Sequence, residues 1–131
     1  MSVSQSRSDA RLKKDIQTNT DCGLDLINDL RTVTYKWKAP SELATDMEGY
    51  DADKTEADYS SKLYGFIAQE VKQALDDNNI TDFAGWHVDT TATDIQGISY
   101  EMFVIPLVKA VQELSAKNDA LEARIATLEG E

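Results

Sequence analysis

The chain has 131 residues, of which 41% are hydrophobic and 28% are charged, and this composition supports one small folded domain with a hydrophobic core. Its 13 basic and 24 acidic side chains give a net charge of -11, which argues against binding to nucleic acid or to an anionic membrane. A single cysteine and a single histidine exclude a disulfide framework and an ordinary zinc site, so we expect no metal and no cofactor.

Targeting signals are not expected either. The longest apolar run, residues 102–108, is far shorter than the ~20 residues that a membrane-spanning helix requires. The first 15 residues lack the apolar core of a signal peptide. We therefore expect no membrane span and no secretion.

The first part of the chain predicts a lead-in, a short helix and a strand. Residues 1–8 are rich in serine and predict a flexible or extended lead-in. Residues 21–30 place leucine and isoleucine at helical spacing, with Asp21 as the expected N-cap. Residues 31–38 alternate valine, tyrosine and tryptophan with threonine and lysine, which predicts a half-buried strand that ends before Pro40.

Residues 39–61 are strongly acidic. They hold seven acidic side chains and one lysine, a local net charge of -6. The spacing of Asp51 and Asp53 imitates a calcium-binding loop, but Glu56 replaces the required glycine and Lys62 replaces the bidentate glutamate. We reject an EF-hand and expect a solvated surface protrusion.

The middle of the chain predicts a strand, a helix and a second protrusion. Residues 63–67 read as a strand, and the segment that follows reads as an amphipathic helix. Residues 78–98 alternate turn residues with aromatic and aliphatic ones, which predicts a long irregular hairpin. The apolar face of the expected helix comprises Ile67, Val71, Ala74 and Leu75.

The last third of the chain carries a heptad repeat. Two series of mostly apolar residues recur every seven positions, three residues apart, over about three and a half heptads. Basic residues at g lie five before acidic residues at e, the spacing that pairs neighbouring parallel chains. Pro106 is expected to kink or delimit the helix near its start. The seam of this predicted parallel coiled coil comprises Val104, Leu107, Val111, Leu114, Asn118, Leu121, Ile125 and Leu128.

The repeat leaves two questions open. A single helix that folds back on its own domain would also place leucine at every seventh position. Valine at a, leucine at d and a lone Asn118 at a favour two strands if the seam is considered by itself. The pattern therefore predicts self-association without fixing the number of chains.

Ser8 and Lys13 are the candidate catalytic pair. They lie five residues apart in the string SDARLKKDI. A neutral lysine can remove the proton of a serine hydroxyl when burial or nearby cations lower the pKa of the lysine. Taken alone, the string has a simpler interpretation, a Ser-Asp pair that begins a helix or turn and is followed by solvated basic residues.

Four segments together carry a family resemblance. SDARLKKDI, YKW, YGFIAQEV and IPLVKAVQEL occur in this order and lead into the heptad repeat. The set resembles the C-terminal intramolecular chaperone of phage tailspikes, tail fibres and neck appendages, the endosialidase-type self-cleaving serine peptidase family. The resemblance spans nearly the whole chain.

The resemblance implies an α+β fold. A small helix and strand body would carry two irregular hairpin protrusions, residues 39–61 and 78–98, and a C-terminal helix over residues 104–131 would form a parallel trimeric coiled coil. Residues 1–8 would be the end of an upstream preprotein with the cleavage segment, and residues 9–131 would be the chaperone domain. The trimer implied by the family replaces the preference for two strands that the seam alone indicates.

The resemblance also implies a function. A homotrimer would register an upstream β-helical phage preprotein, which is both its client and its substrate, and would then release itself by a single self-cleavage. Ser8 would be the nucleophile, Lys13 the general base, and Arg7, Ser8 and Asp9 the cleavage junction. The family implies a cut at or beside the Ser8 to Asp9 bond, whereas an acyl shift onto Ser8 would open the Arg7 to Ser8 bond. The setting would be the host cytoplasm during virion assembly, with release from the mature fibre.

Two other functions compete with this expectation. The first is a trimerisation cap of a phage fibre that does not cleave, in which Ser8 and Lys13 are bystanders. The second is a small hydrolase that acts on other molecules. The sequence disfavours the hydrolase, because it contains no GxSxG motif and no second histidine.

Overall fold

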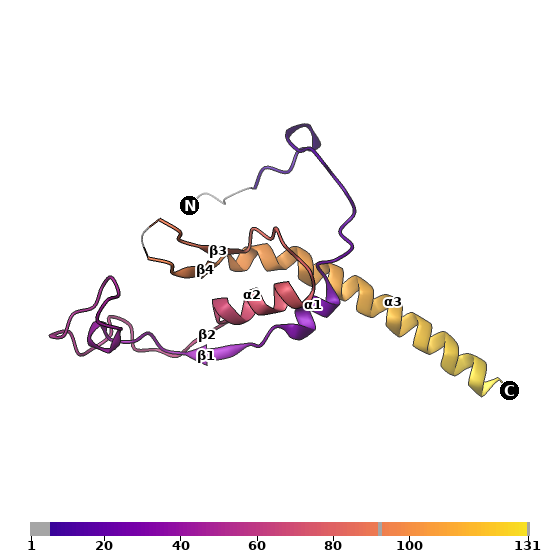
Figure 1. Ribbon diagram of the computed structural model, residues 1–131. Coiled ribbons are helices and arrows are strands. Elements are labelled where there is room, and N and C mark those ends of the chain that lie inside the picture. Colours follow the sequence, from indigo (N-terminus) through magenta and orange to yellow (C-terminus); the bar gives the residue numbers. More distant parts are fainter. Residues whose placement is uncertain (1–5, 92, 131) are drawn as a thin grey trace, which may run out of the picture.

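The computed structural model describes residues 6–91 and 93–130, so the expected lead-in at residues 1–8 falls mostly outside the described chain. Within the described residues the chain combines helices with two small antiparallel sheets, which confirms the mixed α+β class. Figure 1 shows a body of short elements around the first half of a long helix, α3 (Val104–Glu129), whose second half projects away. In this part of the chain we find no helix with the length and apolarity needed to cross a bilayer.

The core lies where α1 (Leu24–Asp29) packs against both α2 (Ala68–Asp77) and α3. The amphipathic face predicted for α2 is largely confirmed, because three of its four expected positions are buried. The fourth, Ile67, is the N-cap residue of α2 and remains 36% exposed. The core cluster comprises Leu26, Val71, Ala74, Leu75, Ile80 and Phe103.

The first sheet pairs β1 (Val33–Tyr35) with β2 (Leu63–Gly65) in antiparallel register, with Val33 opposite Gly65. In β1 the valine and the tyrosine are half-buried and the threonine between them is exposed, which confirms the predicted alternation. Both strands are shorter than expected. β2 ends at Gly65, before the chain turns into α2, and β1 has no partner beyond Tyr35 because β2 begins at Leu63, opposite that residue. Trp37, expected to continue the buried face, is 60% exposed.

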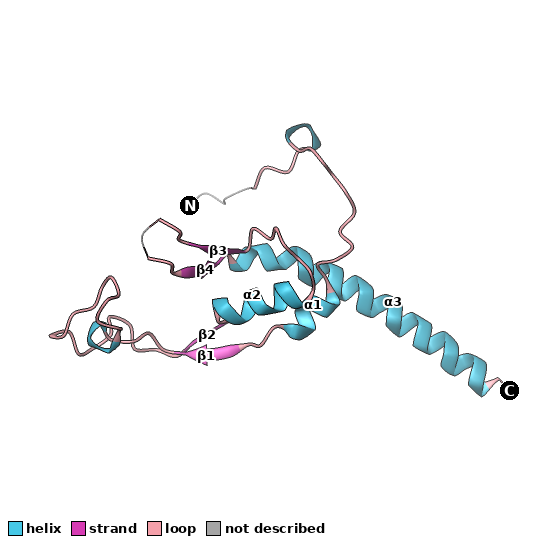
Figure 2. Ribbon diagram, in the orientation of Figure 1, coloured by secondary structure: helices cyan, strands magenta, loops and turns pink. Residues whose placement is uncertain are grey.

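The acidic arm, residues 39–61, joins β1 to β2 and projects from the body as a loop with one short 3-10 turn, η2 (Pro40–Glu42) (Figure 2). Hydrogen bonds cross it, from the Ser41 amide to the Lys54 carbonyl at 2.9 Å and from the Asp51 amide to the Pro40 carbonyl at 3.4 Å. These bonds satisfy backbone groups that the short sheet leaves unpaired. The arm is thus a defined excursion between two strands.

The second hairpin pairs β3 (Trp86–Val88) with β4 (Gln96–Ile98), within residues 78–98. The Asp89 amide donates to the Ile95 carbonyl at 2.9 Å and closes the hairpin near its tip. The indole Nε1 of Trp86 donates to Oε1 of Gln96 at 3.0 Å across the two strands. Residue 92 lies outside the described residues.

The prediction that Asp21 is the N-cap of α1 is wrong. α1 begins at Leu24 with Gly23 in the N-cap position, and Asp21 lies before the helix. Oδ1 of Asn19 accepts the Asp21 amide at 3.3 Å and the Cys22 amide at 3.0 Å, so these residues form a turn of their own. Oε1 of Glu113, on α3, accepts the Leu24 amide at 3.2 Å. A carboxylate from a distant helix therefore makes the hydrogen bond that was expected from a local N-cap.

Pro106 lies in the first turn of α3, so it delimits the helix near its start and does not interrupt it. The first turn of a helix has amides without an intrahelical acceptor, and a residue that lacks an amide hydrogen is tolerated there. A short 3-10 turn, η3 (Tyr100–Phe103), leads directly into α3. Pro106 and Ala110 are the buried residues of α3, and α1 is the element that packs most extensively against this helix.

Candidate functional site

Ser8 and Lys13 are in direct contact. The two residues flank a single 3-10 turn, η1 (Ala10–Leu12), on the N-terminal segment that stands away from the body in Figure 1. Nζ of Lys13 donates a hydrogen bond to Oγ of Ser8 at 2.7 Å. A nucleophile and a base within hydrogen-bonding reach are the geometric requirement of a Ser-Lys dyad.

Backbone and cap hydrogen bonds form the turn between the two residues. The Leu12 amide donates to the Asp9 carbonyl at 3.0 Å, and the Lys13 amide donates to the Ala10 carbonyl at 3.1 Å. Oδ1 of Asp9 accepts the Arg11 amide at 2.9 Å, which makes Asp9 the N-cap of η1. The simpler interpretation of the string, a Ser-Asp pair that begins a turn, thus describes the same residues that form the dyad contact.

Arg11 returns over the turn and binds Asp9 with two nitrogens. Nε donates to Oδ1 at 3.1 Å and Nη2 donates to Oδ2 at 2.8 Å, a bidentate fork. These side-chain bonds, followed by the bond from the Arg11 amide, hold the pKa of Asp9 below its usual value. The fork likewise raises the pKa of Arg11. Sequence analysis missed this pair, although an aspartate two residues before an arginine in a turn was the available signal.

The dyad is open to solvent in the single chain. Residues 6–18 are all exposed, including Arg7, Ser8, Asp9 and Lys13. A lysine amine acts as a base in its neutral form, and burial is the factor that most strongly favours that form. The geometry therefore supplies the contact between nucleophile and base but leaves the pair in water.

The seam residues of α3 are exposed. Every apolar member of the seam has a large exposed fraction, from 48% at Leu107 to 65% at Val111. A neighbouring face of the same helix carries Pro106 and Ala110, which are buried in the body. The helix thus packs on its own domain with residues other than the seam, and the seam itself is unpartnered in the single chain. Residue 131 of the expected coiled-coil segment lies outside the described residues.

Asn118 is the polar member of the seam. Its Nδ2 donates to Oε1 of Glu122 on the next turn of α3 at 3.3 Å, so its amide is occupied within the chain. An asparagine at an a position can fix register at some cost in stability. The contribution of Asn118 to register and stability depends on the chains that pack around it.

A contact between α3 and the start of α1 also escaped the sequence analysis. Oε1 of Glu113 lies so close to Gly23 that a Cβ atom at that glycine would be 2.0 Å from it. Glycine therefore allows the carboxylate to reach the Leu24 amide. The two partners are 89 residues apart in sequence, and no local pattern indicates such a pair.

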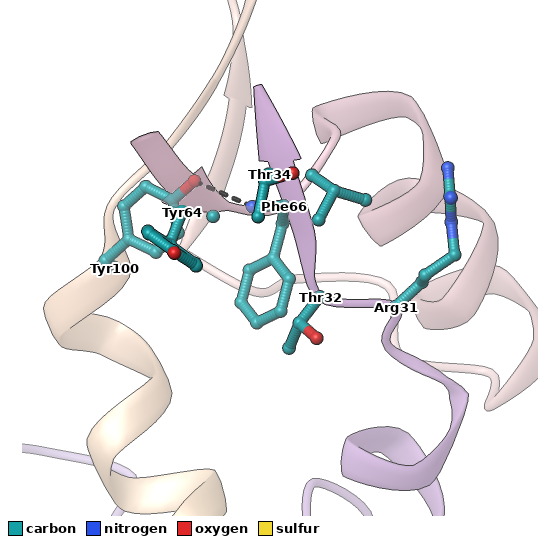
Figure 3. A pocket seen from close by; sticks show the side chains of 8 residues that line it. Arg31, Thr32, Thr34, Tyr64, Phe66 and Tyr100 are labelled. Carbon is teal, nitrogen blue, oxygen red and sulfur yellow. Dashed lines mark hydrogen bonds between the residues drawn. The ribbon is translucent and has the colours of Figure 1, made fainter. Parts of the chain in front are cut away.

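A separate open pocket of about 800 Å³ lies beside the first sheet (Figure 3). Oη of Tyr100 accepts the Phe66 amide at 3.0 Å, and the two rings stack with centroids 5.7 Å apart. The charged member of the lining, Arg31, is bound to Glu70. The lining contains no histidine, carboxylate or lysine, so it does not supply an acid-base pair for hydrolysis of other molecules. The lining comprises Arg31, Thr32, Val33, Thr34, Tyr64, Gly65, Phe66 and Tyr100.

The described ranges, 6–91 and 93–130, contain no candidate metal site. Among these residues we find no group of three or more histidine, cysteine, aspartate or glutamate side chains placed to hold an ion. The candidate site is therefore the pair of Ser8 and Lys13 on its turn, together with the exposed seam of α3.

Comparison with known proteins identifies the family. A model of a peptidase family described as the chaperone of endosialidase matches residues 8–80, more than half of the chain. The matched segment begins at Ser8 and includes the dyad turn, the acidic arm and α2. A search of curated proteins found no match. Membership supports a chaperone role with a client protein, and the resemblance found in the sequence is confirmed. The chain belongs to the chaperone of endosialidase family.

Proposed function

We propose that this chain is an intramolecular chaperone that trimerises an upstream phage fibre or appendage preprotein and then cuts itself free beside Ser8. The observation that carries the proposal is the 2.7 Å hydrogen bond from Lys13 Nζ to Ser8 Oγ, in a chain of a chaperone family named as a peptidase. The exposed seam of α3 supports the assembly step.

The acyl-shift route can be written with the residues of the turn. Neutral Lys13 takes the hydroxyl proton of Ser8, and Oγ forms a bond to the carbonyl carbon of Arg7. The bond from that carbon to the Ser8 nitrogen breaks, and the nitrogen receives the proton from Lys13. Water then hydrolyses the ester, which leaves a carboxylate on Arg7 and restores the Ser8 hydroxyl.

The alternative cut opens the Ser8 to Asp9 bond. Attack of the Ser8 oxygen on its own carbonyl would close a strained lactone ring, so this route favours a Ser8 that acts on the junction of a neighbouring copy. The masses of the two products distinguish the routes. Either route uses Ser8 as nucleophile and Lys13 as base.

The seam would bring three chain ends to one place. Burial of apolar side chains between helices drives the association, and the linkage raises the effective concentration of the upstream segments. A triple-stranded fold then begins at a lower entropic cost. The seam pattern is also compatible with two strands, and the family resemblance is the reason for the choice of three.

Assembly would also activate the dyad. Ser8 and Lys13 are exposed in the single chain, and contact with neighbouring chains or with the folded client would exclude water from them. Cutting would therefore follow assembly. This order suits a chaperone that must stay attached until its client has folded.

The two protrusions, residues 39–61 and 78–98, would contact the unfinished client within the chaperone domain, residues 9–131. Figure 1 shows both extending from the body on the side opposite the free half of α3. The net charge of -6 on the acidic arm would keep these contacts transient and resist aggregation. The process would take place in the host cytoplasm during virion assembly, before release of the chaperone from the fibre.

A cap that does not cleave is the second candidate. The exposure of Ser8 and Lys13 favours it, because a hydrated lysine is a poor base at neutral pH. In that function the seam would hold the fibre chains together permanently, and the turn would be a connection.

One experiment separates the two functions. The chain with its native upstream segment is produced as wild type, Ser8→Ala and Lys13→Ala, and intact mass and oligomer size are measured. Self-release predicts loss of the upstream fragment in the wild type alone, with trimers in all three proteins. Full-length trimers in all three would instead establish the attached cap.

A further inference from the structure

We propose that Asp9 and Arg11 are positioning residues, whose fork holds the turn that brings Lys13 onto Ser8. The inference rests on the proposed function and deepens it, because it names the groups that prepare the dyad before assembly. Both side chains would act by holding the turn in place, and neither would contact the bond that is cut.

The spacing of the dyad requires a special backbone. In an α-helix, residues five apart point in directions that differ by roughly 140° around the axis. In a strand they are separated by about 16 Å. Here one 3-10 turn lies between two extended residues, Asp9 at φ -66° and ψ 131° and Lys13 at φ -115° and ψ 148°. This reversal of the chain brings Nζ to 2.7 Å from Oγ.

Packing against the body does not hold the turn. Leu12, its largest apolar residue, is 64% exposed, and residues 6–18 are exposed throughout. Isolated short helical turns are unstable in water, since few hydrogen bonds compensate for the ordering of the backbone. The side-chain contacts of Asp9 and Arg11 must therefore supply what tertiary packing supplies elsewhere.

Asp9 and Arg11 restrain the N-terminal part of the turn, between its N-cap and its second residue. The Asp9 carboxylate accepts the Arg11 amide at 2.9 Å and fixes the first residues of η1. The Arg11 guanidinium then binds both oxygens of that carboxylate, at 3.1 Å and 2.8 Å, so the carboxylate cannot rotate away from the cap. Bidentate geometry adds direction to the attraction between the charges. A lysine at position 11 would keep the charge and lose the fork.

Proline at position 10 offers an independent way to fix the same turn. The hydrogen bonds of η1 use the amides of Arg11, Leu12 and Lys13, so the amide of Ala10 can be replaced. Position 10 is the first residue of the turn, where proline is favoured, and Asp9 already has the extended ψ that precedes a proline. Ala10→Pro should therefore restore the turn when the fork has been removed.

The test compares self-cleavage rates of the chain with its native upstream segment. Arg11→Ala should slow cutting by about ten-fold to a hundred-fold, the range typical of a misplaced catalytic group. Arg11→Lys should lie between this variant and the wild type. Arg11→Ala with Ala10→Pro should return to within about three-fold of the wild type.

Arg31→Ala is the matched control. Arg31 forms a fork of the same kind with Glu70, at 2.8 Å and 2.6 Å, on the body and away from the dyad. Its loss should leave the rate within about two-fold, because this fork joins β1's lead-in to α2 and does not contact the turn that carries Ser8 and Lys13. Rescue by proline with an inert control supports positioning. An unchanged rate in Arg11→Ala would overturn it, and so would a slow rate that proline does not rescue, since Arg11 would then act on the reaction itself.

A second readout does not depend on cleavage. In the uncut Ser8→Ala chain, the Asp9 carboxyl is titrated by NMR with and without Arg11→Ala. The fork predicts a pKa below the usual aspartate value that returns to that value in the variant. An unchanged titration would overturn the fork. A wild type that never cuts would instead refute the proposed function, so the two failures are distinguishable.

Discussion

The dyad turn and the long helix α3 prepare for function in opposite ways. The hydrogen bonds of the turn all lie within six consecutive residues, Ser8 to Lys13, and the turn does not pack against the body. α3 buries one face on its own domain and leaves a row of half-exposed leucine, valine and isoleucine side chains without a partner. The proposed reacting groups are therefore arranged locally, whereas the seam, which we propose controls them, lacks a partner in the single chain.

This difference assigns separate tasks to the two regions. A local turn can form as soon as the chain is made, long before a fibre has folded. An exposed seam satisfies its apolar surface through association, which depends on the other chains being present. A self-cleaving chaperone needs this combination, because a dyad that worked without assembly would cut before the client was finished.

The largest expected effect comes from a charge in the seam. Leu114→Asp places a carboxylate at a d position in every chain, where burial of an unpaired charge is strongly unfavourable. We expect loss of the oligomer and, as a consequence, loss of self-cleavage. Analytical ultracentrifugation and intact mass measure the two results.

Ala116→Asp is the control for this variant. It adds the same charge two residues further on, on the outer side of the helix, where the side chain is exposed. Assembly and cutting should persist. Undiminished cutting by a monomeric Leu114→Asp protein would show that the dyad does not depend on the seam.

A smaller effect should follow from the link between the seam helix and the body. Gly23→Ala would place a Cβ atom 2.0 Å from Oε1 of Glu113 and 2.8 Å from Cγ of Lys109, so the carboxylate must leave the Leu24 amide. We expect the free energy of unfolding to fall by about 1 kcal/mol, the usual effect of a lost helix cap. Urea unfolding measures it.

The double variant tests the cause. Glu113→Ala removes the acceptor of the same hydrogen bond. In that background, Gly23→Ala should lower the free energy of unfolding only slightly further. Full additivity of the two substitutions would show that Gly23 stabilises the fold without Glu113.

The smallest expected effect concerns pH. Hydrogen bonding to Arg31 lowers the pKa of Glu70, so the folded state holds this carboxylate in its charged form more strongly than the unfolded state does. The resulting stabilisation is present above the unfolded pKa and is lost as the pH falls through the lower folded pKa. The difference in stability between wild type and Glu70→Gln should be small at neutral pH and should disappear in acid.

Urea unfolding of both proteins across the acidic range measures this difference. The pair is exposed, so salt should also reduce the effect. A stability difference that grew as the pH fell would contradict the assignment of the pKa shift to Arg31.

Local patterns predicted the elements that local interactions determine. The buried face of α2 and the continuous α3 helix follow from apolar spacing. The contact between Ser8 and Lys13 could be anticipated because the two residues are five apart, and their motif carries the family resemblance. The two hairpins were anticipated, but their strands are only three residues long because each pairs with a single short neighbour.

The remaining contacts depend on tertiary structure. Asp21 has the right chemistry for a cap of α1, yet Glu113 reaches the helix from 89 residues away. Trp37 is exposed beyond the last paired residue of β1, because β2 begins only at Leu63, opposite Tyr35, and the segment around Trp37 does not reveal this register. The number of chains around the seam depends on how side chains pack between copies. The heptad pattern of one sequence indicates that packing only weakly.

The central claim is that a dyad formed in each chain acts after the chains have assembled. Native mass spectrometry during synthesis of the chain with its upstream segment tests it most directly, because each species reveals both its oligomer size and whether it has been cut. We predict uncut monomers first, then uncut trimers, and cut products that arise from trimers alone. Cut monomers that accumulate before any trimer would contradict the account.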